Sequence, residues 1–290
     1  MLIQLFINAL ITGAIYSLVA SGFSLIYSTC RFVHFAHGAT ITLSAYFMYF
    51  LFSNLSLDFW LSLIFTIIFA SFLGFFMNFV YKQFRKRKAS PFILLMVSFA
   101  MLILFESLIL IFFGTDIKVF DFIKVSEGLK IFGIIITPLQ LFILLTSIIL
   151  FVLLFLFMKR TKIGKAMRAV ADNKDLAEIL GISSEKIYLY SFIVSSLIAG
   201  VAAVLIGLEQ NLWPTMGTNL MIKGFTAAII GGIGSVPGAI LGSFLLGFVE
   251  NFSVWFLPSS YKDAITFILL FLFLLFRPNG ILGVKGGVEK

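Results

Sequence analysis

Apolar residues occur along this chain in long runs that short polar stretches separate. The pattern predicts membrane-spanning segments near 4–28, 37–53, 57–81, 91–113, 138–158 and 187–208, a glycine-rich stretch at 221–252 and a last helix near 262–276. Runs of about 18 or more apolar residues are typical of transmembrane helices, whereas a transmembrane β-barrel shows short alternating segments. We therefore expect an all-α, polytopic integral membrane protein embedded in a lipid bilayer.

Clusters of basic residues predict how the chain is oriented, because basic loops stay on the cytoplasmic side of a membrane. Three basic elements are the loop 82–90, the loop 159–186 and the tail from Arg277 onward. The loop 114–137 balances three lysines against three acidic residues, so we place it outside. With the first two basic loops inside, the N-terminus lies outside.

The number of times that the stretch 221–252 crosses the membrane determines on which side the C-terminal tail lies. A cytoplasmic C-terminus requires this stretch to cross twice and to turn at 231–238, which gives about 8–9 membrane crossings with short or broken helices. Each arm would span only about 20 Å at 1.5 Å per residue, less than the roughly 30 Å of a hydrocarbon core. Short arms are tolerated where they pack inside the protein or line a wet cavity. A single crossing with an outside tail is the alternative.

Composition narrows the class of protein further. Of 290 residues, 61% are hydrophobic and only 12% are charged, which excludes an ordinary soluble globular protein. The net charge of +8 belongs to the cytoplasmic loops, so we expect no nucleic-acid partner. The single cysteine, Cys30, excludes an internal disulfide and a cysteine metal cluster. The N-terminal segment lacks the basic start of a signal peptide, so we expect its helix to be retained.

Each half of the chain carries one hydrophobic pair of segments that small residues interrupt, at 31–38 and at 231–238. In transporters built from internal repeats, such paired interruptions mark the substrate path. The alternative is that small residues only allow helices to pack closely. The candidate path residues are Gly22, His37, Gly38, Gly231, Gly232 and Gly234.

Glu106 is a further candidate path residue because it lies within the apolar segment 91–113. An acidic side chain inside a membrane is costly and is by default a functional-site hypothesis. The alternative is a carboxyl group near the outer end of the segment that reaches water. For His37 the alternative role is a hydrogen-bonded packing group.

The loop 159–186 is expected to fold into two short helices. The first runs from Gly164 to Ala171, and the second is capped by Asp172 or Asn173 and ends at Leu180 before Gly181. In the second helix three aliphatic side chains share one face at i, i+3 and i+4, namely Leu176, Ile179 and Leu180. This face requires cover, either from lipid headgroups or from a groove on a soluble partner.

Four motifs follow one another in this order: residues 34–38 (His-Phe-Ala-His-Gly), 168–182 (Arg-Ala-Val-Ala-Asp-Asn-Lys-Asp-Leu-Ala-Glu-Ile-Leu-Gly-Ile), 223–239, which contains Gly-Gly-Ile-Gly-Ser-Val-Pro-Gly, and 277–283 (Arg-Pro-Asn-Gly-Ile-Leu-Gly). Together they resemble the motifs of the branched-chain amino acid (Liv-type) ABC transporter permeases. The chain has no long extra N-terminal region and so resembles the shorter of the two permease subunits. It departs from the family at His34, where asparagine is common, and at Glu106, where an amide pair is usual.

The resemblance implies that residues 1–290 form one permease domain with 159–186 as its cytoplasmic coupling loop. The ATPase-coupling residues it implies are Arg168, Asp172, Asp175, Leu176, Ala177, Glu178, Leu180 and Gly181. The implied location is the bacterial inner (plasma) membrane. The implied partners are a second homologous permease subunit, two cytoplasmic ABC ATPase subunits and a periplasmic solute-binding protein.

The resemblance predicts ATP-driven import of branched-chain amino acids. The sequence contains neither Gly-x-x-x-x-Gly-Lys-Ser/Thr nor His-Glu-x-x-His. We therefore expect no enzyme activity, catalytic residue, metal or cofactor in this chain, and ATP hydrolysis by separate subunits. Import of urea, amides or other amino acids and a passive channel are the alternatives that the residues leave open.

Overall fold

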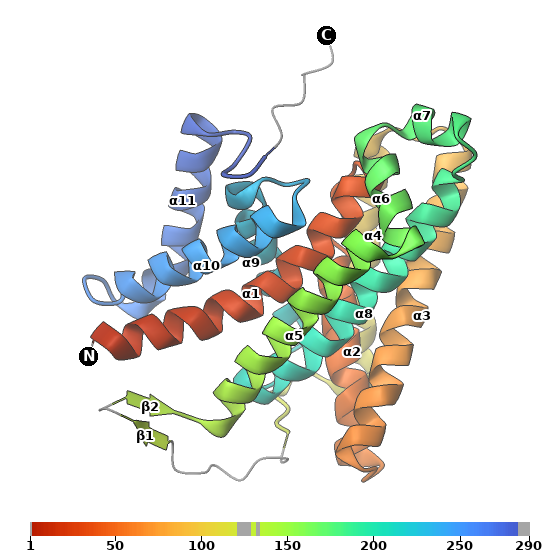
Figure 1. Cartoon of the computed structure of the whole chain (residues 1–290). Helices are drawn as coiled ribbons and strands as arrows, with labels where there is room; N and C mark the ends of the chain where they lie inside the picture. Colours follow the sequence, from red (N-terminus) through yellow and green to blue (C-terminus); the bar gives the residue numbers. More distant parts are fainter. Residues whose placement is uncertain (1, 121–128, 132–133, 284–290) are drawn as a thin grey trace.

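The computed structural model describes residues 2–120, 129–131 and 134–283, which form a bundle of helices and one short hairpin (Figure 1). The helices are α1 Leu2–Cys30, α2 His37–Tyr49, α3 Phe59–Lys86, α4 Pro91–Phe113, α5 Pro138–Arg160, α6 Lys162–Asp172, α7 Lys174–Ile179, α8 Ser184–Gln210, α9 Met216–Gly231, α10 Val236–Ser253 and α11 Lys262–Phe276. A π-helical turn, Phe50–Asn54, follows α2, and a 3-10 turn, Ser259–Tyr261, precedes α11. The prediction of an all-helical membrane fold is confirmed.

In the described part of the chain, seven helices are long and apolar enough to cross a membrane. They are α1, α3, α4, α5, α8, α10 and α11, the last together with the turn before it. The two other apolar helices are short, with 13 residues in α2 and 16 in α9, or roughly 20 and 24 Å. Both are packed inside the bundle, the setting in which a short intramembrane helix is tolerated. The number of crossings stays a prediction.

Small side chains place α1 and α8 at the centre of the bundle. Nearly every residue of α1 from Gly13 to Thr29 is buried, and α8 buries an alanine- and serine-rich face against it. The outer helices α5 and α11 instead expose leucine, isoleucine and phenylalanine along most of their length, as lipid-facing helices do. The sequence thus sorts its helices by side-chain size, with close-packing residues inside and bulky ones outside.

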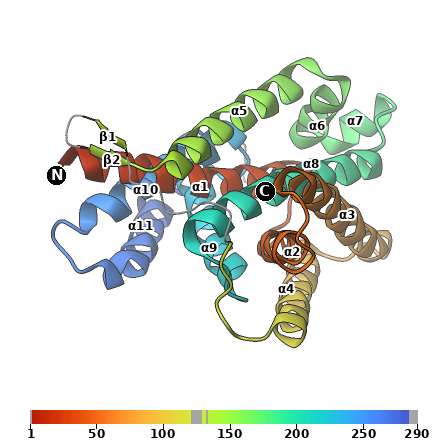
Figure 2. The same cartoon turned by 90° about the horizontal axis from the view of Figure 1, so that it is seen from below.

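Two helix pairs in different halves of the chain share one geometry. The long helices α1 and α8 each end in a non-glycine residue with positive φ, Arg31 (56°) and Asn211 (64°), and a short helix follows each. The first turns of these short helices meet, since Gly38 of α2 lies against Gly217 of α9, and the Gly217 N–H donates to Thr42 Oγ1 at 3.0 Å. Figure 2 shows α2 and α9 side by side below α8. Half-helices that meet inside a bundle are typical of transporters.

The predicted turn within 221–252 is present. The helix α9 ends at Gly231, Gly232 has φ of +113°, and α10 begins at Val236 with the Ser235 hydroxyl accepting from the Gly238 N–H at 3.1 Å. The helix α9 starts at Met216, five residues earlier than the pattern predicted. The turn between the two packed helices covers residues 232–235 and is thus shorter than the predicted 231–238.

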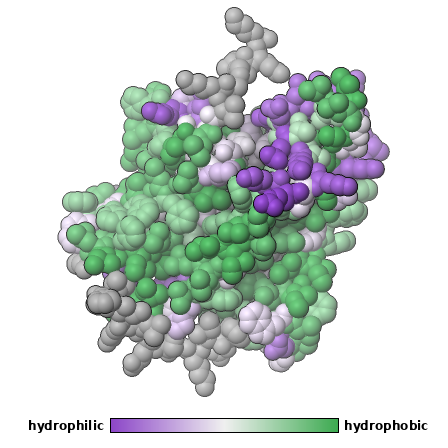
Figure 3. All heavy atoms as spheres, in the orientation of Figure 1, coloured by the Kyte–Doolittle hydropathy of each residue, from purple (hydrophilic) through white to green (hydrophobic). Residues whose placement is uncertain are grey.

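The predicted inside and outside elements lie at opposite ends of the bundle. At one end Arg85 of α3 pairs with Glu185 at the start of α8 at 3.0 Å, and Arg31 donates to the Ala171 carbonyl of α6. At the other end Gln4 exchanges hydrogen bonds with Ile135 of the hairpin at 2.9 and 3.0 Å. Hydrophilic side chains gather over α6 and around the apolar tip at α7, above a broad apolar surface (Figure 3). The orientation across the membrane stays a prediction.

Two local expectations differ from the structure. The loop predicted at 82–90 is helical up to Lys86, because basic side chains in the last helical turn interact favourably with the helix dipole. The expected loop 114–137 contains an antiparallel hairpin of β1 Leu129–Ile131 and β2 Ile134–Ile136, with Leu129 opposite Ile136. Part of this loop, residues 121–128 and 132–133, lies outside the described residues.

Candidate functional site

The coupling loop folds into the two helices that its sequence predicts. The side chain of Asn173 caps α7 by accepting from the Leu176 N–H at 2.9 Å, and Gly181 ends it with φ of +84°. Bonds from the Gly181 N–H to the Glu178 carbonyl and from the Ile182 N–H to the Ala177 carbonyl close this end. Of the two caps that the sequence allowed, the structure uses Asn173, and Asp172 is the last residue of α6.

The aliphatic face of α7 points away from the rest of the chain. Leu176, Ile179 and Leu180 are 53%, 80% and 71% exposed, whereas Ala177 is buried against the neighbouring elements. Asp175, Glu178 and Gly181 are also exposed, and Glu178 accepts from the Ser184 hydroxyl. A cluster of three exposed aliphatic side chains on a six-residue helix at the polar end is a candidate docking surface.

The helix α6 fixes α7 to the bundle. The Thr161 hydroxyl caps α6 by accepting from the Gly164 N–H at 2.9 Å, and Gly164 lies directly against the backbone of Met158 in α5. Met167 and Val170 are buried beneath the helix, and the bond from Arg31 joins its end to α1. The helix α6 thus connects α7 to α5 and α1 through packed backbone.

Three of the predicted path residues lie together at close helix contacts. The Ser195 hydroxyl of α8 donates to the Gly22 carbonyl of α1 at 2.7 Å, and His37 is fully buried beside both. A Cβ atom added to Gly22 would lie 2.7 Å from His37 Nε2, and one added to Gly38 would lie 2.5 Å from the Gly217 carbonyl oxygen. These residues set helix packing at the centre of the bundle, and their assignment to a substrate path stays a prediction.

Three glycines of the interruption at 231–238, namely Gly231, Gly232 and Gly234, have different surroundings. Gly231 lies against the Gly238 carbonyl, and the closing motif folds back on α9 through a bond from the Leu282 N–H to the Gly231 carbonyl at 2.8 Å. Gly232 is packed against Gly283, whereas a Cβ atom on Gly234 would meet open space.

Gly234 and Arg168 line the same cavity. This cavity of about 750 Å³ lies between α5, α6 and the turn that joins α9 to α10. The structure thus brings one predicted path residue and one predicted coupling residue together, although they are far apart in the sequence.

Glu106 faces another helix. Its carboxylate accepts from the Thr218 hydroxyl of α9, and the residue is half-buried. The acid therefore joins α4 to the first turn of α9, next to the point where α2 and α9 meet.

The sequence analysis missed a charged cluster on α9, α10 and α11. Glu250 is 1% exposed, and its carboxylate accepts from the Tyr16 hydroxyl at 2.7 Å, from the Thr266 hydroxyl and from Lys223 Nζ at 3.1 Å. Lys223 Nζ also lies 3.0 Å from Asp263. Lys223 and Glu250 both lie within the apolar stretch 221–252. Charges within a predicted span were the signal that could have identified this site.

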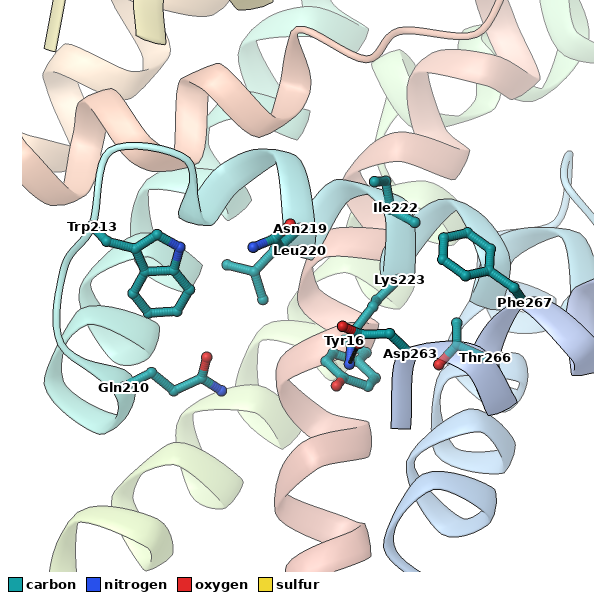
Figure 4. A pocket seen from close by; sticks show the side chains of 10 residues that line it. All are labelled: Tyr16, Gln210, Trp213, Asn219, Leu220, Ile222, Lys223, Asp263, Thr266 and Phe267. Atoms are coloured by element: carbon teal, nitrogen blue, oxygen red, sulfur yellow. Dashed lines mark ion pairs between the residues drawn. The ribbon is translucent and has the colours of Figure 1, made fainter. Parts of the chain in front are cut away.

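The charged cluster lines a cavity of about 230 Å³, shown in Figure 4. Its walls come from α1, α9, α11 and the end of α8, and the lining residues are Tyr16, Gln210, Trp213, Asn219, Leu220, Ile222, Lys223, Asp263, Thr266 and Phe267. None of the predicted path residues is among them. Four polar groups, those of Tyr16, Lys223, Asp263 and Thr266, lie together beside apolar side chains, a combination typical of small-molecule sites, while Gln210 and Asn219 lie apart from them near Trp213.

This bundle, with its paired short helices, its exposed aliphatic face on α7 and its charges within apolar helices, defines a multi-pass membrane transport protein. A family profile described as "Branched-chain amino acid transport system / permease component" matches residues 5–274. The chain therefore belongs to this family, as its motifs predicted.

Curated relatives agree over nearly the whole chain. The high-affinity branched-chain amino acid transport system permease protein BraD of Pseudomonas aeruginosa is 33% identical over 99% of this chain and 97% of BraD. LivH of Escherichia coli K12, named in the same way, is 31% identical with the same coverage. A probable LivH of Methanocaldococcus jannaschii is 31% identical over 96% of this chain and 91% of its own. These relatives are transport permeases rather than enzymes, and the predicted location in the bacterial inner membrane is confirmed.

One solved structure shares the fold. PsaBC from Streptococcus pneumoniae in complex with Fab superposes with a TM-score of 0.50 over 94% of this chain and 91% of that chain, at 14% identity. At this identity the likeness concerns the fold alone.

Proposed function

We propose that this chain is a membrane subunit of an ATP-driven importer of branched-chain amino acids. It works with a second homologous permease subunit, two cytoplasmic ABC ATPase subunits and a periplasmic solute-binding protein. Residues 1–290 form one permease domain, and 159–186 are its coupling loop. The names of the relatives support the substrate, and the exposed aliphatic face of α7 supports the ATPase partners.

The observation that carries the proposal is the placement of α7. Its three exposed aliphatic side chains lie at the end of the bundle that carries the basic loops, which is the cytoplasmic end by the positive-inside rule. Inserted into a cleft of an ATPase subunit, Leu176 and Leu180 supply buried apolar area, and Asp175 and Glu178 supply register through charge. Ala177 faces the permease and fixes the helix in place.

The packing of α6 supports a route from this docking surface to the membrane. Closure of the ATPases on nucleotide shifts α7, and α6 carries the displacement to α5 and α1 through the contacts of Gly164 and Arg31. Arg168 of α6 and the turn between α9 and α10 line one cavity, so a shift of α6 also reaches the inner ends of α9 and α10. Two packing arrangements that differ in this way provide alternating access. The chain itself performs no covalent chemistry.

The test of the proposal replaces Leu176 and Leu180 together with glutamate. Each leucine contributes roughly 1.5–3 kcal/mol when fully buried, and a desolvated carboxylate adds a further cost. We expect the variant to fold and reach the membrane but to lose both co-purifying ATPase subunits and leucine uptake. Lys165→Glu, which adds an acid on an exposed position of α6, is the matched control and should retain both. A double variant that keeps its ATPases and transports normally contradicts the coupling assignment.

The same uptake assay tests the substrate and the energy source. Uptake of leucine, isoleucine and valine should require ATP, and urea should not enter. Uptake that persists without ATP identifies a passive channel, and uptake of urea in place of the amino acids identifies the alternative substrate.

The proposed orientation is tested by single cysteines in a Cys30→Ser background. Asp116→Cys should react with an impermeant thiol reagent in intact cells, because the 114–137 loop lies outside. Lys86→Cys and Arg277→Cys should react only after the membrane is permeabilised. Labelling of Arg277→Cys from outside would overturn the double crossing of α9 and α10.

A further inference from the structure

The cavity around Lys223 is chemically divided. Figure 4 shows Lys223, Asp263, Tyr16 and Thr266 gathered together, with Trp213 and Leu220 on one side of them and Phe267 on the other. A small molecule in this cavity would therefore meet charges in the middle, with the Trp213 and Leu220 side chains and the amides of Gln210 and Asn219 on one side and Phe267 on the other. The volume of about 230 Å³ lies below the roughly 300–1,000 Å³ of sites for drug-sized ligands, so the cavity suits a smaller molecule.

The two acidic residues that flank Lys223 differ in how free their carboxylates are to bind a ligand. Glu250 is 1% exposed and already accepts from Tyr16, Thr266 and Lys223, so it is satisfied within the protein. The Asp263 side chain is 75% exposed and lies 3.0 Å from Lys223 Nζ. Because the Asp263 carboxylate is exposed, solvent screens this ion pair more than the pair between Lys223 and the buried Glu250. The contact between Lys223 and Asp263 is therefore the one that a ligand would open.

We propose that this cavity binds the charged head of a free amino acid between Lys223 and Asp263. Lys223 takes the α-carboxylate and Asp263 takes the α-ammonium group, while an aliphatic side chain lies against Trp213 and Leu220. A zwitterion inserted in this way adds no net charge, and its ammonium group takes the place of Lys223 beside Asp263, whereas a simple carboxylate adds a net negative charge and leaves Asp263 without a cation. The inference rests on the proposed transport of amino acids and assigns the residues that contact the substrate.

Trp213 provides a reporter inside the cavity. The chain has three tryptophans, and Trp60 and Trp255 are exposed at positions that do not line the cavity. In a Trp60→Phe, Trp255→Phe background the fluorescence of the purified chain in nanodiscs follows Trp213 alone. Titration with millimolar leucine should give a saturable change. Two analogues, 4-methylpentanoate without the ammonium group and 3-methylbutylamine without the carboxylate, should each bind at least tenfold more weakly.

Substitutions test the two contacts separately. Asp263→Asn is nearly isosteric at an exposed position and should weaken leucine binding at least tenfold without loss of folded protein. Lys223→Met is combined with Glu250→Gln, so that no buried carboxylate is left unpaired, and should abolish the fluorescence change. Lys262→Gln removes a neighbouring charge outside the cavity and is the matched control, with binding unchanged.

The outcomes separate this inference from the proposed function. The inference would be overturned if Trp213 fluorescence does not change with leucine, if Asp263→Asn binds leucine normally, or if leucine and both analogues bind equally. Leucine uptake by the same chain with its partners would then still support the transport function. Absence of leucine uptake by the wild-type assembly would instead contradict the proposed function, whatever Trp213 reports.

Discussion

The face of α7 and the cluster around Lys223 are opposite departures from the usual distribution of side chains between water and membrane. On α7 three aliphatic side chains are exposed in the polar part of the molecule, and around Lys223 a lysine and a buried glutamate lie within apolar helices. In our proposals a soluble partner covers the exposed face of α7, and a polar ligand binds at the cluster. Both candidate sites thus lie where side chains depart from the distribution that builds the fold.

The two regions also differ in how they are held. The cluster is held by interactions among four helices, since Tyr16, Lys223, Glu250 and Thr266 come from α1, α9, α10 and α11. The helix α7 is held by its two local caps, by the bond from Ser184 to Glu178 and by one buried alanine. Damage to the cluster should therefore affect stability, and damage to the α7 face should affect partner binding with little effect on stability.

The largest effect is expected from Lys223→Met alone. This change leaves Glu250 buried without its cation, and breaking one side of a buried ion pair costs roughly 3–5 kcal/mol. We expect a marked loss of folded protein, measured by membrane yield and by thermal melting in detergent. Adding Glu250→Gln should restore most of the yield, because no charge is then left unpaired. Normal stability of the single variant would mean that the pair contributes nothing to the fold.

A smaller effect is expected from Asn173→Ala. The Asn173 side chain satisfies the Leu176 N–H, and loss of such a cap costs roughly 0.5–2 kcal/mol of helix stability. Because α7 is outside the bundle, thermal melting should stay unchanged while ATPase affinity falls several-fold. Asn173→Ser, which retains a capping oxygen, should bind like the wild type. A fall in melting temperature with unchanged ATPase affinity would show that the cap supports the bundle rather than the docking surface.

Much of the fold follows from local sequence signals. Apolar runs locate the long helices, and the capping side chain of Asn173 and the glycine at 181 locate α7, because each signal acts within a few residues. The turn between α9 and α10 follows from its glycines in the same way. The exposed face of α7 follows from the helical spacing of Leu176, Ile179 and Leu180.

The remaining features depend on contacts between distant segments. The contact of Gly217 with Thr42 joins residues far apart in the chain, and no spacing within either segment encodes it. Lys223, Glu250 and Asp263 lie on three helices, so their convergence requires the packing of the whole C-terminal half. The hairpin at 129–136 was missed because its strands are only three residues long. The predicted path glycines were found, but their close contacts with neighbouring backbone depend on the tertiary packing.

The central claim is that the exposed face of α7 contacts an ATPase subunit, and site-specific photocrosslinking tests it most directly. A photoreactive residue at position 179, where the isoleucine is 80% exposed, should crosslink to the ATPase in the assembled transporter. The same residue at Asp116, at the opposite end of the bundle, should give no ATPase crosslink. Absence of a crosslink from position 179 in an assembly that contains the ATPase and hydrolyses ATP would contradict the account.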